Sequence, residues 1–329
     1  MLAGAFHLET VMSAEPTSPD QSRAWVGVAL ALSAFIIWGL SPIFYKALAH
    51  VPPLEVLSHR TLWSVAFVGG YALLTGRGAR IREALTTRRT LAVLVLAALL
   101  IAVNWFTFIF AIQVGRATES SLGYYVFPLL SVALGVLVLK ERLSRAQTGA
   151  VALAVLAVVV LTLGLGAAPW IALILSSTMS VYGLLKKTIS AGPVTTVTVE
   201  ALLLSPLAAI WLYGAHVEGW TALVDRPGGW FGASWADSAL LVASGPLTGG
   251  PLLLFAAAAQ RLRYATLGLL QFLNPTLQFF CAVVVFGEAF TLWHGIAFGM
   301  IWTAIAIYMA AGRSERRVVK GPESPLMRK

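Results

Sequence analysis

Ionisable side chains lie within apolar stretches at a few positions of this 329-residue chain. Glu55, His59 and Arg60 begin the stretch over 53–75, and the i, i+4 spacing puts Glu55 and His59 on one helical face. A Glu–His pair can carry a proton near neutral pH, because imidazole titrates there. Alternatively, Glu55 only caps or solvates a helix end, with Arg60 paired to it or to Glu119. Since an intramembrane charge is costly, we expect Arg60 to bind substrate or to form a buried ion pair.

Two further carboxylates are candidates for proton coupling. Glu200 lies within another apolar stretch, where desolvation would favour a protonated acid that can exchange its proton. Pairing with Lys186 or Lys187 near the membrane surface explains this residue equally well. Glu119 lies beside Arg116 at the start of a third stretch, where the helix dipole alone also favours an acid.

Uncharged polar and aromatic residues supply candidate cavity walls. The segment Ser244-Gly245-Pro246-Leu247-Thr248-Gly249-Gly250-Pro251 predicts two interruptions in one helix, and a broken intramembrane helix points to a binding site. A helix kinked only for packing is the alternative. We expect the substrate-binding residues to be Trp38, Arg60, Asn104, Trp105, Tyr124, Ser244, Thr248, Gln271 and Asn274.

Spacing relates some of these polar residues to one another. Gln271, Asn274 and Gln278 follow i, i+3, i+7 and are predicted to share one face, either as contacts between helices or as a cavity lining. Glu141 and Glu288 precede Ser144 and Thr291, which can cap the helices that follow them. We interpret both glutamates as parts of tight hairpins.

The composition is that of an integral membrane protein. Hydrophobic residues make up 58% of the chain and charged residues 11%, with a mean hydropathy of +0.82. Stretches of about 20 apolar residues are long enough to cross a bilayer as helices. We predict an all-α fold with ten transmembrane helices, near residues 25–45, 53–75, 90–112, 117–139, 145–166, 168–186, 194–214, 236–258, 264–286 and 291–312.

An internal repeat divides these predicted spans into two sets of five. A shift of 147 residues relates Gln113 to Gln260, Arg116 to Arg263, Pro128 to Pro275 and Glu141 to Glu288, and a shift of 145 relates Glu55 to Glu200. Because each copy holds an odd number of spans, the two copies must be inverted in the membrane. Inverted repeats are typical of secondary transporters that alternate access around a central site.

Basic residues predict the orientation. With the N-terminus in the cytoplasm, 19 of the 23 Lys and Arg residues fall on the cytoplasmic side, as the positive-inside rule requires. The net charge of +9 therefore reflects topology, and nucleic-acid binding is not needed to explain it. We expect both termini in the cytoplasm and divide the chain into a disordered tail over 1–22 (Met12 is a second candidate start), repeats over 23–166 and 167–312, and a basic tail over 313–329.

Several of these segments resemble the RarD group of EamA-type carriers, in the drug/metabolite transporter superfamily. The resemblance covers about 24–312 and rests on Ile37-Trp38-Gly39 with Pro42, Pro53-Leu54-Glu55-Val56-Leu57-Ser58-His59-Arg60, Asn104-Trp105, Glu119-Ser120-Ser121-Leu122-Gly123-Tyr124 and Thr266-Leu267-Gly268-Leu269-Leu270-Gln271-Phe272. It implies a ten-helix inner-membrane exporter of small metabolites or drugs. Phe127 departs from the group's pattern, which has Asn before Pro128, whereas Asn274-Pro275 retains it.

The resulting hypothesis is a secondary carrier for a small amphipathic or aromatic compound, driven by a proton or substrate gradient. No phosphate-binding Gly-x-x-x-x-Gly-Lys-Ser/Thr loop occurs, so we expect no ATP-driven pumping by this chain. The five histidines lack metal-ligand spacing, and we expect neither metal nor cofactor. A membrane-embedded enzyme acting on a lipid-linked substrate and a passive channel are the alternatives. The predicted partners are a small-molecule substrate and the lipid bilayer; the oligomeric state is left open.

Overall fold

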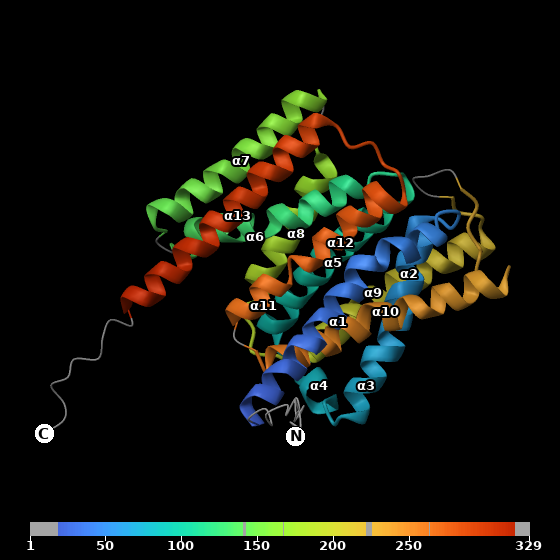
Figure 1. Cartoon of the computed structure of the whole chain (residues 1–329). Coiled ribbons are helices and arrows are strands. Elements are labelled where there is room, and N and C mark those ends of the chain that lie inside the picture. The colour runs from blue at the N-terminus through green and yellow to red at the C-terminus, as the bar shows by residue number, and fades with distance from the viewer. Residues whose placement is uncertain (1–18, 141–142, 167, 222–225, 263, 320–329) are drawn as a thin grey trace, which may run out of the picture.

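Helices account for all the regular secondary structure of the described chain (Figure 1). The computed structural model describes residues 19–140, 143–166, 168–221, 226–262 and 264–319. In chain order the helices are α1 (Pro19–Ala47), α2 (Pro53–Ser64), π-helix η1 (Val65–Gly69), α3 (Gly70–Leu74), α4 (Gly78–Thr86), α5 (Arg88–Gln113), α6 (Ala117–Leu139), α7 (Arg145–Leu165), α8 (Trp170–Lys186), α9 (Pro193–Val217), α10 (Trp235–Ala259), α11 (Tyr264–Leu270), α12 (Leu273–Phe280), π-helix η3 (Cys281–Val285) and α13 (Leu292–Val319). The all-α prediction is confirmed.

Eight helical segments of the described residues are long and apolar enough to cross a membrane. They correspond to eight of the predicted spans, and Trp170–Lys186 is a shorter apolar helix at the position of a ninth. The remaining predicted span, 53–75, is built from α2, η1 and α3 in direct succession. Its first part is polar, which explains why length and hydropathy together do not select it.

The predicted interruption of the span over 236–258 is wrong, because α10 is one helix of 25 residues. Its glycines serve close packing instead. A Cβ atom on Gly245 would lie 2.5 Å from the backbone of Trp63 in α2, and one on Gly249 would lie 2.4 Å from Val68 in η1. Small residues four apart let two membrane helices approach closely. The Gly/Pro segment is therefore a packing face, as the alternative interpretation held.

The break falls instead in the span over 264–286. There α11 ends at Leu270 and α12 begins at Leu273. Pro275 lies in the first turn of α12, where its missing N–H costs no helical hydrogen bond. Gln271 lies outside α12, so only Asn274 and Gln278 keep the predicted helical relation, and the Gln278 side chain donates to Asn274 Oδ1 at 3.0 Å.

Two boundaries differ from the sequence prediction. Helix α1 already begins at Pro19, so the proposed disordered tail over 1–22 is too long at its C-terminal end, and residues 1–18 lie outside the described chain. Helix α4 was not predicted. It is amphipathic and buries Ile81 and Ala84 against α9 and α5. α13 runs on to Val319, into the segment expected to be a tail.

Helix ends confirm most of the capping predictions. Ser144 forms a capping box with Gln147 at the start of α7, and the Thr291 hydroxyl meets His294 Nδ1 at 2.9 Å at the start of α13. Glu288 does more than shape its own hairpin. Its carboxylate accepts the backbone N–H groups of Ala117 and Thr118, at 2.6 and 2.7 Å, and so caps α6 across the molecule. Glu141 lies outside the described residues.

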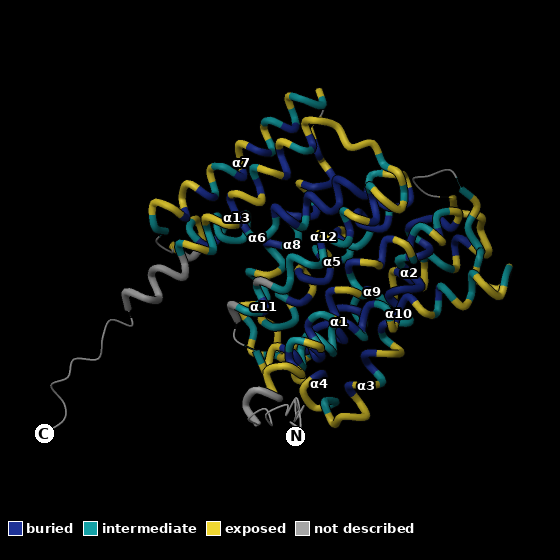
Figure 2. Tube along the Cα trace, viewed as in Figure 1, coloured by how far each residue is buried: buried dark blue, intermediate teal, exposed yellow. Residues whose placement is uncertain are grey.

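The helices form a bundle whose interior is buried and whose outer faces are exposed (Figure 2). α1 packs on α10 and α12, α8 packs on α6 and α5, and α2 packs on α9 and α10. α7 and α13 pair with each other along one side of the bundle (Figure 1). Large apolar side chains on the outer faces, among them Leu137, Leu163 and Leu292, are more than two-thirds exposed, as lipid-facing residues are.

The close approach of α10 to α2 generates a stability prediction. Replacing Gly245 by Ala would force a methyl group into the Trp63 backbone, so we expect the free energy of unfolding to fall by about 1–3 kcal/mol. Gly250 on the same helix has no heavy atom within 4 Å of the added Cβ, and Gly250→Ala should leave stability unchanged or raised. Denaturation of the purified protein by SDS measures both; equal effects at the two positions would contradict the packing role.

Candidate functional site

Arg60 is the most isolated charge in the interior of the described bundle. It lies in α2 and is 6% exposed. Its Nη1 donates to the Tyr45 hydroxyl of α1 at 2.8 Å, and its guanidinium carbon stands 4.1 Å from the ring centroid of Trp105 in α5. A guanidinium over an indole face is a cation–π contact. Three helices thus meet at this side chain.

Aromatic and amide groups continue from Arg60 toward α8. The Tyr45 ring meets Phe108 edge-on at 5.7 Å, and Phe108 meets Tyr124 of α6 at 5.9 Å. The Tyr124 hydroxyl donates to Asn104 Oδ1 at 3.2 Å. Asn104 then donates to α8, to the Leu175 carbonyl at 3.0 Å and the Thr178 hydroxyl at 2.9 Å. We call these residues the central cluster: Tyr45, Arg60, Asn104, Trp105, Phe108, Tyr124 and Thr178.

A tight connection between α1 and α2 positions Arg60 and Tyr45. Pro53 starts α2 with its φ angle already set for a helix. Gln113, at the end of α5, donates to the carbonyls of Leu48 and Val51 in the connection, both at 3.1 Å. These bonds satisfy two backbone groups that would otherwise be costly to bury. They also fix the α1–α2 hairpin to the helix that carries Trp105.

Glu55 does not pair with His59 or Arg60. Its carboxylate, fully buried, accepts the backbone N–H groups of Gly229 and Trp230 at 3.0 and 2.8 Å. Arg226 from the same loop donates to the carbonyl of Ala49, in the α1–α2 connection. The loop over 226–234 is therefore fastened across the start of α2, and we call these contacts the loop clasp.

His59 lies under this loop. Its imidazole stacks on Phe231 with ring centroids 4.8 Å apart. Both of its ring nitrogens are buried, with no hydrogen-bond partner among the described residues. The predicted Glu–His proton pair is therefore not formed in this conformation.

The other two candidate carboxylates each have a cation. Glu119 accepts from Arg116 within the first turn of α6. Glu200 of α9 accepts from Lys186 Nζ at 2.6 Å and from the Tyr182 hydroxyl at 3.0 Å, both on α8. The alternative interpretation, in which Glu200 pairs with Lys186, therefore agrees with this structure. The Glu200 side chain is only 4% exposed and that of Lys186 is 20% exposed, so the carboxylate is buried while the ammonium group is partly accessible.

Five predicted substrate residues lie apart from the central cluster. Trp38 is two helical turns before Tyr45 and packs with Phe35 and Phe255. The Ser244 and Thr248 hydroxyls donate to carbonyls of their own helix. Gln271 and Asn274 lie at the α11–α12 break, where the Asn274 carbonyl faces Gly39 of α1. Arg60, Asn104, Trp105 and Tyr124 are the four that the fold brings together.

Sequence reasoning missed Tyr45, Phe108 and Thr178. Phe108 carries no signal, because a lone Phe in an apolar helix is indistinguishable from packing. Thr178 follows two serines, and hydroxyl groups in membrane helices ordinarily bond their own carbonyls, as this one also does with Ile174. Tyr45 could have been considered, since a buried Tyr hydroxyl needs a polar partner, but its place at the end of the predicted span over 25–45 is also where interfacial aromatic residues collect.

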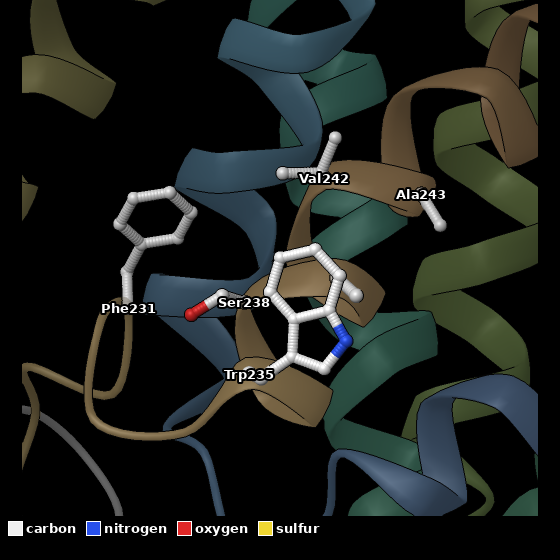
Figure 3. A pocket seen from close by; sticks show the side chains of 6 residues that line it. Phe231, Trp235, Ser238, Val242 and Ala243 are labelled. Atoms are coloured by element: carbon white, nitrogen blue, oxygen red, sulfur yellow. The ribbon is translucent and has the colours of Figure 1, made fainter.

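A separate hollow of about 360 Å³ lies beside the loop clasp (Figure 3). Its lining consists of Phe231, Trp235, Ser238, Ala239, Val242 and Ala243. The walls come from the loop and from the first two turns of α10, and they are almost entirely apolar. Trp235 is 86% exposed. None of the charged candidate residues lines this hollow, and we do not assign it to the substrate.

Comparisons with known proteins agree with this architecture. Residues 25–163 match the model of the EamA-like transporter family. An uncharacterized transporter of Vibrio cholerae is 40% identical over 305 residues, covering 91% of this chain and 98% of the relative. Protein RarD of Salmonella typhimurium is 38% identical, covering 88% and 96%, and Protein RarD of Escherichia coli is 37% identical, covering 92% and 100%.

The fold also recurs in a crystal structure that covers 87% of this chain and 98% of that one. The two superpose with a TM-score of 0.57 at 21% sequence identity, a likeness of fold alone. The full-length relatives are transporters, not enzymes, which removes the enzyme alternative. The chain therefore belongs to the EamA-like transporter family and is a multi-pass membrane transporter similar to the RarD proteins.

Proposed function

We propose that this protein is a secondary transporter, an exporter of a small amphipathic or aromatic compound, which works by alternating access between two inverted five-helix repeats. The observation that carries the proposal is a symmetry in the helix packing. In this scheme α1, α2, α5, α6 and α7 of the first repeat correspond to α8, α9, α10, α12 and α13 of the second.

When each helix is replaced by its counterpart in the other repeat, the main contacts between the repeats become contacts that are also present. The α6–α8 contact becomes α12–α1, the α5–α8 contact becomes α10–α1, and the α5–α9 contact becomes α10–α2; all six are present. The α2–α9, α6–α12 and α7–α13 contacts map onto themselves and are present as well. Such a pattern is expected when two equivalent units surround a central axis. It supports a carrier whose two units rock against each other around one site.

The orientation that we propose puts both termini in the cytoplasm of a bacterial inner membrane. The described chain begins and ends at the same end of the bundle, and α4 lies at that end too (Figure 1). The segment over 77–89, which includes α4, carries five arginines. Basic segments favour the cytoplasmic side. The loop clasp, which joins the other ends of α1 and α2 to the α9–α10 loop, is then the outer closure.

The central cluster lies where the substrate of such a carrier would bind. Four helices of the first repeat and α8 of the second contribute to it, so relative motion of the repeats would change its shape. Aromatic faces and a few oriented polar groups are typical of small-molecule sites. Glu200, buried and bonded to an ionisable partner, is the carboxylate that we propose for proton coupling.

Transport is testable in liposomes without knowledge of the driving ion. Purified protein should accelerate exchange of a labelled substrate against the same unlabelled compound, with a rate that saturates. A carrier shows this counterflow because its binding site must bind a new substrate molecule before it turns back to the other side of the membrane. Candidate compounds come from a thermal-shift screen. Flux that rises linearly with concentration and shows no counterflow would instead support the passive-channel alternative.

If Glu200 carries the coupled proton, its replacement should affect flux driven by a pH gradient but not counterflow exchange. Glu200→Gln should abolish flux driven by a pH gradient, because the amide cannot exchange a proton. That variant leaves Lys186 buried without its partner, so the matched protein is Glu200→Gln with Lys186→Met, which removes both charges. We expect the double variant to keep counterflow and to lack the response to pH. A pH-driven flux that survives in the double variant excludes Glu200 from coupling.

The loop clasp predicts a local change in hydrogen exchange. Glu55→Gln keeps the shape of the side chain but is neutral and offers one acceptor oxygen in place of two. One hydrogen bond is therefore lost and the other is no longer charge-assisted, and a hydrogen bond to a charged group contributes about 1.5–3 kcal/mol. The peptide over 226–234 should therefore exchange its amide protons faster in detergent. The exposed Glu83→Gln serves as control, and a loop unaffected by Glu55→Gln argues against the clasp.

A further inference from the structure

We propose that the transported compound bears a single carboxylate, which binds the guanidinium of Arg60, and an aromatic or apolar body, which lies against the rings of the central cluster. This inference rests on the transport function proposed above and names the chemical class of its substrate. It starts from a charge that the described protein leaves without a counterion.

Arg60 is a buried cation without an acidic partner. Ion pairs within the described ranges join His50 to Asp237, Arg116 to Glu119 and Lys186 to Glu200, and none includes Arg60. The only hydrogen-bond acceptor that it meets there is the Tyr45 hydroxyl. An arginine in the interior of a membrane protein normally pairs with an acid, because an isolated buried charge is costly. Arg60 has no such acidic partner among the described residues, which indicates that its counterion is an anion that binds from outside the chain.

The free edge of the guanidinium has the geometry for a carboxylate. Tyr45 occupies Nη1, and Nε is buried with no acceptor among the residues the structure describes. The remaining edge, formed by Nε and Nη2, can donate two parallel N–H groups. Two parallel donors match the two oxygens of one carboxylate. The Trp105 ring, whose centroid lies 4.1 Å from the guanidinium carbon, restrains the position of that edge.

The charge count favours a monoanion over a phosphate. Lys46, the basic residue beside Tyr45, stands over the ring of Phe286 at 5.6 Å instead of joining Arg60. One guanidinium neutralises one carboxylate, whereas a dianionic phosphate would keep a net charge in a site of low dielectric. The buried glutamates Glu55, Glu119 and Glu200 already bind backbone amides or cations. Glu119 keeps one oxygen, Oε2, without a partner in the described chain, but the central cluster itself holds no acid. A substrate ammonium group would therefore have no counterion there, and we infer an aromatic acid rather than an amino acid.

The class of ligand is testable on the purified, full-length protein by thermal unfolding in detergent. The probes are arylalkyl carboxylates from benzoate to 4-phenylbutanoate, each with its neutral amide, together with phenylalanine and inorganic phosphate. A ligand that binds only the folded state raises Tm with its concentration. We expect at least one carboxylate to raise Tm saturably. Its amide, phenylalanine and phosphate should each bind at least tenfold more weakly.

Variants separate a binding role for Arg60 from a structural one. Arg60→Met removes the charge but keeps an unbranched side chain, so without ligand its Tm should equal or exceed that of the parent protein, and the carboxylate should no longer shift it. Arg60→Lys should retain the shift with at least tenfold weaker binding, because an ammonium lacks the two parallel donors. Arg80→Met, at an exposed position of α4, should keep the full shift. A lower Tm of unliganded Arg60→Met would reveal a structural arginine.

The proposal would also be overturned by equal stabilisation by acid and amide, by no stabilisation by any of the carboxylates, or by an undiminished carboxylate shift in Arg60→Met. A shift by phosphate alone would assign the site to a dianion and equally refute it. These results are independent of the liposome assay. Saturable counterflow of a neutral compound would leave the transport function in place while excluding the anionic substrate.

Discussion

Lipid offers no hydrogen-bond partner, and the internal order of this bundle follows from that constraint. Many hydroxyl groups on the spans donate to carbonyls of their own helix, as Ser58, Thr107 and Thr248 do. Longer polar side chains reach further and connect helices: Asn104 joins α5 to α8, and Gln113 secures the α1–α2 connection. Where a helix starts with free N–H groups, Glu288 supplies the acceptor from a distant hairpin. Polar groups therefore tie the helices together as well as providing chemistry.

The sequence predicts where the helices lie better than it predicts the contacts between them. Apolar length and hairpin residues such as Ser144 locate the helices, because both act locally. The α10 prediction failed because Gly and Pro have two meanings, a break or a close contact, and only the neighbouring helix α2 decides between them. Four members of the central cluster were predictable, since Arg60, Asn104, Trp105 and Tyr124 are costly or conspicuous in lipid. Phe108 and Thr178 were not, because their roles depend on which helices lie beside them.

The repeated chain holds unequal chemistry in its two copies. The sequence repeat relates Glu55 to Glu200, but Glu55 lies in the first turn of α2 and Glu200 lies further into α9. Glu55 accepts backbone amides from a loop, whereas Glu200 accepts from a lysine and a tyrosine. Pro128 lies within the unbroken α6, whereas its counterpart Pro275 follows a break between α11 and α12. In the proposed mechanism the two repeats are the units that rock against each other. The side chains have diverged, so the two halves of the motion need not have equal energies.

The Glu288 cap also constrains where the protein can bend. One carboxylate binds three groups at the start of α6, two amides and the Thr118 hydroxyl, while its own backbone belongs to the turn that follows η3. Separating the two would leave the carboxylate and the buried N–H groups of Ala117 and Thr118 without their partners, so we expect the turn and the start of α6 to move together. We therefore expect bending at the other end of that segment, at the two-residue turn 271–272 between α11 and α12. Helix α12 and π-helix η3 separate this bending point from the turn that caps α6, the helix that carries Tyr124.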